Sequence, residues 1–200
     1  MLDLNWGHEA INKILEMGKF NYVINFASLC MVNQSWSNPT DWLRTNIIGQ
    51  THLCECIAKS KNIEAYIHFT TPEVYGNSPK EVEEGHPHEP STPYSLSRSC
   101  GDKITKMIFS QTDIKVIFTR AASIYCETQH LYRLIPRMLL HCEYGMDFRI
   151  EGLGDTVRQY VHMEDVSVAL MKIIDASVDK FSEYHIANKN AYSVNQIVKL

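Results

Sequence analysis

Two short segments of the chain carry side chains that suit redox chemistry on a sugar hydroxyl. One contains Thr71 and Glu73, and the other contains Tyr94 and Arg98. A tyrosine that removes a proton from a hydroxyl must ionise well below its free pKa of about 10, and a fixed cation nearby favours the phenolate. Arg98 follows Tyr94 by four residues, so both side chains share one face if a helix begins there. The set predicts Tyr94 as a base, Thr71 as a hydrogen-bonding partner of the same hydroxyl, and Glu73 as a second proton carrier.

A purely structural interpretation competes with this one. Tyr94 would then be an aromatic residue at the start of a helix, and Glu73 would be a solvated loop acid. A Tyr-x-x-x-Arg pair alone favours that interpretation. We favour the functional one because Thr71 follows an apolar run with the character of a strand, and ligands gather at the carboxyl ends of strands in open α/β sheets.

The segments that must position these residues predict an α/β fold. Apolar, β-branched runs typical of buried parallel strands alternate with stretches that carry apolar residues at helical spacing. The expected strands are residues 22–27, 66–70, 115–120 and about 183–187, and the expected helices are residues 40–59, 95–110 and a last one from about 193. This alternation is typical of a doubly wound parallel sheet with right-handed crossovers.

The glycine-rich turn of a dinucleotide-binding fold is missing from the sequence. Such a fold places a Gly-x-Gly-x-x-Gly turn after its first strand, where a helix N-terminus holds the pyrophosphate. Gly152-Leu153-Gly154 is the nearest match, and it lies in the second half of the chain. Residues 1–4 have the pattern of a strand end, so we expect the chain to begin after the turn.

Composition argues against several other classes of protein. The net charge of −4 offers no basic surface for nucleic acid or an anionic membrane. The six cysteines show no zinc-binding spacing, so we expect reduced thiols and no metal site. The sequence contains no apolar run long enough to cross a bilayer and no N-terminal signal pattern. The expectation is a cytoplasmic protein.

Several motifs occur in the order found in the extended short-chain dehydrogenase/reductases that modify nucleotide-activated sugars. They are Ser35 to Pro39 with Thr45-Asn46 and Gly49, Thr70 to Gly76, Pro93 to Arg98 with Asp102, Arg120 to Tyr125, and Gly154 to Asp165. The chain thus resembles the NAD-dependent epimerase/dehydratase family over nearly its full length, and most closely the dTDP-glucose 4,6-dehydratases. The resemblance implies a Rossmann-like fold, NAD as cofactor, a nucleotide-activated sugar as partner, and a homodimer if the chain is complete.

The resemblance also implies roles for individual residues and for two regions. The implied cofactor-binding residues are Asp3, Leu4, Ala27, Thr45, Tyr94 and Arg98, and the implied substrate-binding residues are Thr71, Ser123 and Arg158. Residues 1–125 would form a partial NAD-binding Rossmann domain that lacks its first βαβ unit. Residues 126–200 would form part of a substrate-binding region, from which the strand near 183–187 returns to the sheet.

The implied dehydratase mechanism has one gap. In the family, the Tyr takes the proton of the sugar 4-hydroxyl while hydride passes to NAD, and the Glu removes the proton at C5. An Asp then protonates the departing 6-hydroxyl, and hydride returns to C6. Pro72 stands at the position of that Asp and has no proton to give, while Arg98 stands at the position of a lysine. A nucleotide-sugar 4-epimerase or decarboxylase therefore remains an alternative, as does a truncated or degenerate homologue without turnover.

Overall fold

The computed structural model describes residues 8–77, 81–150, 152–176 and 178–199. The chain divides into two compact units. The first unit consists of Met1–Arg120 with Ser177–His185, and the second of Ala121–Ala176 with Ile186–Leu200. Asp3, Leu4 and the expected strand end at residues 1–4 lie outside the described residues.

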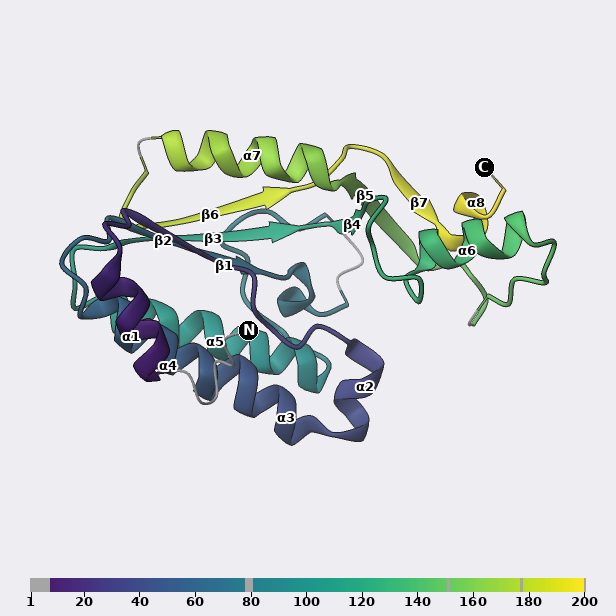
Figure 1. Cartoon of the computed structure of the whole chain (residues 1–200). Coiled ribbons are helices and arrows are strands. Elements are labelled where there is room, and N and C mark those ends of the chain that lie inside the picture. Colours follow the sequence, from purple (N-terminus) through teal and green to yellow (C-terminus); the bar gives the residue numbers. More distant parts are fainter. Residues whose placement is uncertain (1–7, 78–80, 151, 177, 200) are drawn as a thin grey trace. The chain divides into compact units, whose positions relative to one another are not determined.

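A four-stranded sheet forms the centre of the first unit (Figure 1). Its strands are β1 (Tyr22–Asn25), β2 (Ala65–Thr70), β3 (Lys115–Ala121) and β6 (Phe181–Ile186), in the order β1-β2-β3-β6. β2 runs parallel to both β1 and β3, with Ala65 opposite Tyr22 on one side and Lys115 on the other. The predicted α/β fold with a parallel sheet is therefore confirmed. Each predicted strand is present with bounds shifted by two residues or fewer at each end.

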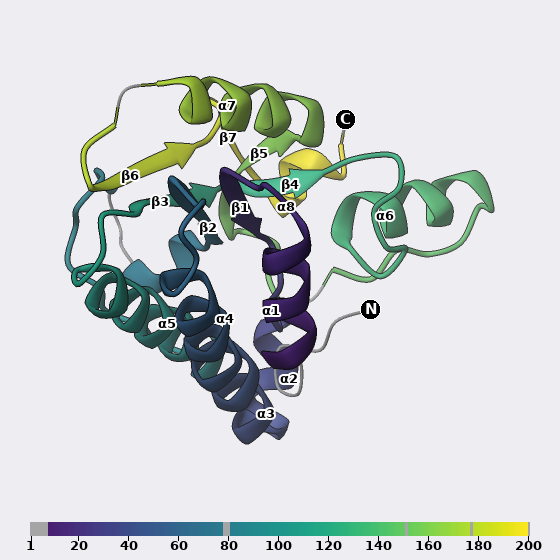
Figure 2. The same ribbon diagram turned by 60° about the vertical axis from the view of Figure 1, so that its left-hand side comes forward.

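The helices of the first unit lie largely on one face of this sheet. They are α1 (His8–Met17), α2 (Val32–Ser37), α3 (Pro39–Leu43), α4 (Gln50–Ala58) and α5 (Pro93–Phe109), with a 3₁₀ turn, η2, at Pro72–Tyr75. Figures 1 and 2 show α1, α4 and α5 side by side on that face. The single helix expected over residues 40–59 is instead one run with a π-helical segment, η1 (Arg44–Gly49), in its middle. Such irregular turns are frequent at functional sites.

The hydrophobic core of the first unit lies between these helices and the sheet. Leu53 and Ile57 on α4 and Phe109 on α5 pack with Tyr66 and Val116 of the sheet. Ile57, Tyr66, Phe109 and Val116 have no exposed surface. Burying an aliphatic or aromatic side chain of this size stabilises the fold by about 1.5–3 kcal/mol. The core therefore fixes α5, the helix that carries Tyr94 and Arg98, against the strands.

The second unit contains a small three-stranded sheet and three helices. Its elements are β4 (Ser123–Tyr125), α6 (Leu134–Glu143), β5 (Val157–His162), α7 (Met163–Asp175), β7 (Ala191–Ser193) and α8 (Val194–Ile197). β5 pairs with β4 in parallel and with β7 in antiparallel orientation. Ser193 caps α8 through a reciprocal pair of hydrogen bonds with Gln196, which explains the helix expected near this residue. Among the described residues, no helix combines the length and apolar character needed to cross a bilayer.

Candidate active site

The segment with Thr71 and Glu73 folds as the end of β2 followed by η2. Thr71 is extended, with φ −144° and ψ 144°, as expected for a residue that precedes a proline. Its hydroxyl oxygen accepts a hydrogen bond of 3.2 Å from the backbone N–H of Glu73, which caps the turn. Pro72 occupies the first position of the turn, where no backbone N–H is required. The backbone conformation at position 72, where the family has its acid, is thus well suited to proline.

The segment with Tyr94 begins helix α5. Thr92 and Ser95 form a capping box, in which each side-chain oxygen accepts a hydrogen bond from the other's backbone N–H, both at 3.0 Å. Tyr94 therefore lies in the first turn of α5, and its backbone N–H donates to the Ser35 hydroxyl at 3.2 Å. The ring of Tyr94 is buried. The helix expected from Ser95 is confirmed, and it begins at Pro93.

The structure brings Thr71, Glu73, Tyr94 and Arg98 together. Burial raises the pKa of Tyr94, while the Arg98 cation and a hydrogen bond with the Thr71 side chain lower it. The nearby Cys30 and Glu73 raise it further, so the net pKa lies above its usual value. The lowering of the Tyr94 pKa by Arg98 and Thr71 thus does not outweigh the desolvation of the phenolate in this structure.

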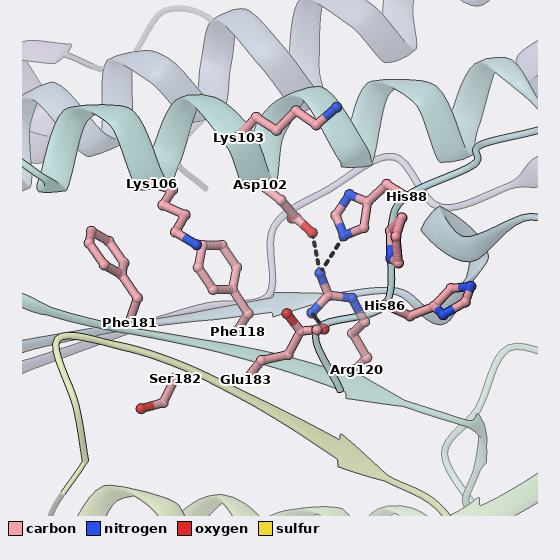
Figure 3. Close-up of a pocket in the computed structure, with 12 residues that line it drawn as sticks. His86, His88, Asp102, Lys103, Lys106, Phe118, Arg120, Phe181, Ser182 and Glu183 are labelled. Carbon is pink, nitrogen blue, oxygen red and sulfur yellow. Dashed lines mark hydrogen bonds and ion pairs between the residues drawn. The ribbon is translucent and has the colours of Figure 1, made fainter. Parts of the chain in front are cut away.

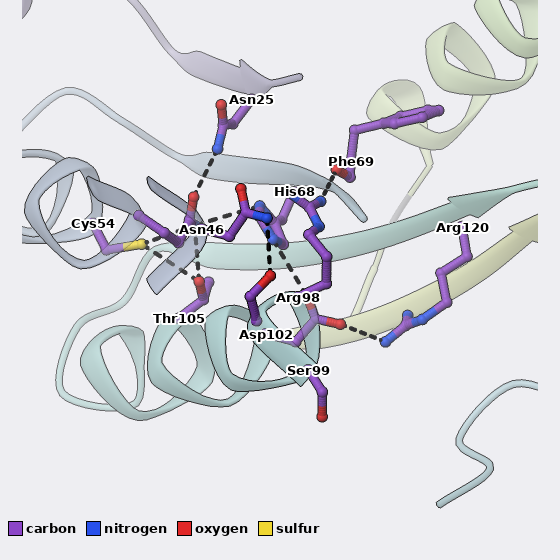
Figure 4. Close-up of polar contacts among 12 residues, drawn as sticks. Asn25, Asn46, Cys54, His68, Phe69, Arg98, Ser99, Asp102, Thr105 and Arg120 are labelled. Carbon is purple, nitrogen blue, oxygen red and sulfur yellow. Dashed lines mark hydrogen bonds and ion pairs between the residues drawn. The ribbon is translucent and has the colours of Figure 1, made fainter. Parts of the chain in front are cut away.

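Arg98 is hydrogen-bonded to the sheet at the end of β2 (Figure 4). It is 3% exposed, and its Nη2 donates to the backbone carbonyl of Phe69 at 2.5 Å. Its Nε is buried and has no hydrogen-bond partner among the described residues. Arg98 thus acts on Tyr94 through its charge while its guanidinium is fixed to the end of β2.

The loop after β1 is fixed by a residue of the π-helical segment. The side chain of Asn46 accepts a hydrogen bond from the Leu29 N–H and donates to the Leu29 carbonyl, both at 2.9 Å. It also donates to the hydroxyl of Ser97 on α5 at 3.0 Å. α5 packs closely here, because a Cβ on Gly101 would lie 2.6 Å from the Asn46 carbonyl oxygen. Asn46 belongs to a recognised motif, yet nothing in the sequence identified it as the residue that ties the loop to α5.

The remaining predicted site residues have different locations. Ala27 is exposed just after β1, and its N–H donates to the Asn25 side chain at 2.9 Å. Thr45 is half-buried next to Asn46 in the π-helical segment. Ser123 and Arg158 belong to the second unit, where Ser123 begins β4 and Arg158 lies exposed on β5.

A buried polar network that the sequence did not reveal supports the same helix (Figure 4). Asp102 on α5 lies 3.3 Å from His68 Nε2 on β2 and 2.8 Å from Arg120 Nη2 on β3. Burial raises the pKa of Asp102, but His68, Arg120 and Arg98 outweigh burial, so this pKa lies below its usual value. Burial lowers the pKa of His68, so its imidazole is neutral at pH 7. The residues of this network come from distant parts of the chain, so their spacing in the sequence does not indicate that they pair.

The titratable groups of the described residues offer no metal centre. No group of three or more His, Cys, Asp or Glu side chains in this part of the chain is arranged to hold a metal ion.

Comparison with known proteins gives consistent matches. The model of the NAD dependent epimerase/dehydratase family matches residues 2–187. A trifunctional UDP-glucose 4,6-dehydratase of Arabidopsis thaliana is 28% identical over 96% of this chain and 29% of its own length. The dTDP-D-glucose 4,6-dehydratase of Homo sapiens is 27% identical over 94% of this chain and 54% of its own length.

A solved structure has the same fold. The dTDP-glucose 4,6-dehydratase of Bacillus anthracis, crystallised with NAD, superposes with a TM-score of 0.86 at 26% identity. The match covers 98% of this chain and 60% of that protein. The chain thus spans between 29% and 60% of the length of the three proteins described here.

Proposed function

The chain belongs to the NAD-dependent epimerase/dehydratase family, and from this premise we propose that its first unit carries the acid–base site of a nucleotide-sugar 4,6-dehydratase. The observation that carries the proposal is the environment of the Tyr94 phenol, which is hydrogen-bonded with the Thr71 side chain and feels the charges of Arg98 and Glu73. The substrate would be a nucleoside-diphosphate sugar, as the names of the relatives suggest.

Each residue of the site has a defined task in this proposal. Tyr94 removes the proton of the sugar 4-hydroxyl, and Thr71 holds that hydroxyl and the phenol in line. Glu73 removes the proton at C5. NAD bound here would supply the hydride-transfer chemistry, and the 6-hydroxyl would leave as water with a proton from solvent, because Pro72 has none to give. Arg98 stabilises the Tyr94 phenolate through its charge and keeps its position through Phe69.

The residues present are compatible with NAD at this edge of the sheet. Ala27 is exposed after β1, and Asn46 holds the following loop at Leu29. Thr45 lies beside Asn46 on the same segment. We assign Ala27, Thr45, Tyr94 and Arg98 to the cofactor side. Ser123 and the exposed Arg158 are assigned to the substrate, and a guanidinium suits a diphosphate.

The assembly and compartment are further parts of the proposal. α5 exposes Leu96 and Met107, which are 47% and 68% exposed, and the adjoining η1 exposes Ile48. Large exposed apolar side chains of this kind support pairing of two copies through these helices. Cys54, Cys56, Cys100, Cys126 and Cys142 are not joined in disulfides, which supports a reducing compartment such as the cytoplasm.

The proposal is tested by incubating the purified chain with excess NAD and dTDP-glucose and identifying the product by NMR. We expect a 4-keto-6-deoxy sugar nucleotide. The Tyr94→Phe variant removes the base and keeps the ring, and it should lower the rate by about 10²–10⁴-fold. Binding of the sugar nucleotide, measured by calorimetry, should be retained. A product that keeps its 6-hydroxyl would overturn the dehydratase assignment.

A 4-epimerase is the second candidate, because of Pro72. An epimerisation at C4 needs Tyr94 and Thr71 but no acid for a departing 6-hydroxyl. Pro72 is exposed at the start of η2 and supplies no proton. The same incubation separates the two candidates, since an epimerase would yield the C4 epimer with no keto product.

A further inference from the structure

A cavity of about 300 Å³ lies within the first unit, apart from the residues proposed for catalysis (Figure 3). Its walls are α5, β3, β6 and the loop that precedes α5. Thr71, Glu73, Tyr94 and Arg98 are not among the residues that line it. Pockets for small ligands usually begin at about this volume and combine apolar walls with a few polar groups.

Two phenylalanines give the cavity an apolar wall. Phe118 on β3 is 6% exposed, and Phe181 at the start of β6 is half-buried. Figure 3 shows the two rings on either side of the Lys106 ammonium, which lies 5.5 Å from the centroid of the Phe181 ring. An apolar cavity of about 150 Å³ is sufficient to hold benzene. The volume and the two rings therefore suit a ligand with one flat apolar ring and a polar substituent.

The charges around the cavity are unequal. The guanidinium of Arg120 is neutralised by Asp102 and Glu183, each at 2.8 Å. Lys103 and Lys106, one turn apart on α5, are exposed, and no carboxylate of the described residues lies within ion-pair distance of either. The cavity therefore has an excess of positive charge on its α5 side.

Arg120 supplies a second, independent indication of a ligand. Its side chain lines the cavity and is 1% exposed. Its Nε is buried and has no hydrogen-bond partner among the described residues. Buried donors in proteins are nearly always paired, so an unpaired one beside a cavity indicates an acceptor that the chain itself does not provide.

We propose that this cavity binds a small aromatic carboxylate. The ring lies against Phe118 and Phe181, and the carboxylate lies between Lys106 and the unpaired Nε of Arg120, with Lys103 adding positive charge at the α5 wall. The proposal does not depend on the nucleotide-sugar activity, because the cavity shares no residue with the proposed catalytic group.

The proposal is tested by titrating the full chain with fluorobenzoate and following the fluorine NMR signal. We expect saturable shift or broadening of the signal. The neutral isostere fluorobenzamide should bind at least several-fold more weakly, and inorganic phosphate should displace the probe poorly. Equal binding of the amide would overturn the role of the lysines. Displacement by phosphate as effective as by benzoate would overturn the role of the aromatic wall.

Matched charge variants complete the test. The double variant Lys103→Gln/Lys106→Gln should bind fluorobenzoate about tenfold more weakly, as expected for the loss of two exposed charge contacts. The double variant Lys59→Gln/Lys61→Gln removes the same charge from exposed positions of the same unit, away from the cavity, and should bind as the parent does. Both should keep the parent's circular dichroism. Equal affinity of the two double variants would overturn the proposal.

Discussion

The carboxylate of Asp102 lies 2.8 Å from the guanidinium of Arg120, and both side chains are almost fully buried. The pair joins α5 to β3, and the other oxygen of Asp102 faces His68 on β2. The helix that presents Tyr94 and Arg98 is thus connected to two strands by charge as well as by apolar packing. Removing one partner of a buried ion pair leaves an uncompensated charge, which typically destabilises a protein by about 3–5 kcal/mol.

The Asp102→Asn variant should therefore lose up to about 3–5 kcal/mol in its free energy of unfolding, with Glu183 remaining as a partner of Arg120. Urea denaturation monitored by circular dichroism measures this loss. Glu164→Gln is the matched control, because Glu164 is 88% exposed and lies 3.7 Å from His162. An exposed pair of this kind contributes about 1 kcal/mol or less. A similar small change in both variants would contradict a structural role for the Asp102–Arg120 pair.

The Arg98→Met variant should shift ionisation of Tyr94 to higher pH. Burial already raises the pKa of Tyr94, and the Arg98 charge is the largest opposing influence. Removing the charge should raise this pKa further, because a neighbouring opposite charge favours the ionised form of the phenol. The pH–rate profile should then reach its plateau at correspondingly higher pH.

Arg98→Lys serves as the control, since it keeps the charge and should shift the profile less. Ultraviolet absorbance of the phenolate, compared with that of Tyr94→Phe, reports the same ionisation without turnover. An unchanged titration in Arg98→Met would show that the cation does not act on the tyrosine.

Sequence patterns predicted the parts of the site that depend on local structure. The apolar runs predicted the strands, and helical spacing predicted a helix over residues 95–110. The structure begins this helix at Pro93, so Tyr94 and Arg98 both lie on it. The net direction of the Tyr94 pKa was not predictable, because burial depends on packing between distant segments. The same reason explains why Asp102 and His68 were not recognised as partners. The sequence indicates only that Pro72 cannot act as the acid of the elimination step. The structure adds that Pro72 begins a 3₁₀ turn, a position that favours proline.

Part of the loss of stability at acid pH should come from protonation of Glu183. Burial raises its pKa, but hydrogen bonds from His185 and Tyr75 and the charge of Arg120 bring it from the usual 4.5 to about 2. A folded-state pKa below the unfolded value means that Glu183 stabilises the fold above about pH 4.5, and that this contribution falls away between about pH 4.5 and 2.

The Glu183→Gln variant should therefore be less stable than the parent at neutral pH, and the difference should shrink as pH falls through this window. Urea unfolding at a series of pH values measures it. Asp102 contributes a dependence of the same sign, so the variant's stability should still fall with pH, but less steeply. A constant difference between the two proteins would contradict the assignment.

Pro72→Asp should restore the acid that elimination requires. Pro72 is exposed at the first position of η2, so an aspartate fits there without displacing a buried group, and a negative charge is favourable at the start of a helical turn. General acid catalysis typically contributes about 10²–10⁴-fold. The variant should therefore form the 4-keto-6-deoxy product at least about tenfold faster than the parent. Pro72→Ala removes the ring without adding an acid and should leave the rate near the parent's. Equal rates in the Asp and Ala variants would mean that the protonation step uses another group, and an increased yield of the C4 epimer alone would favour the epimerase.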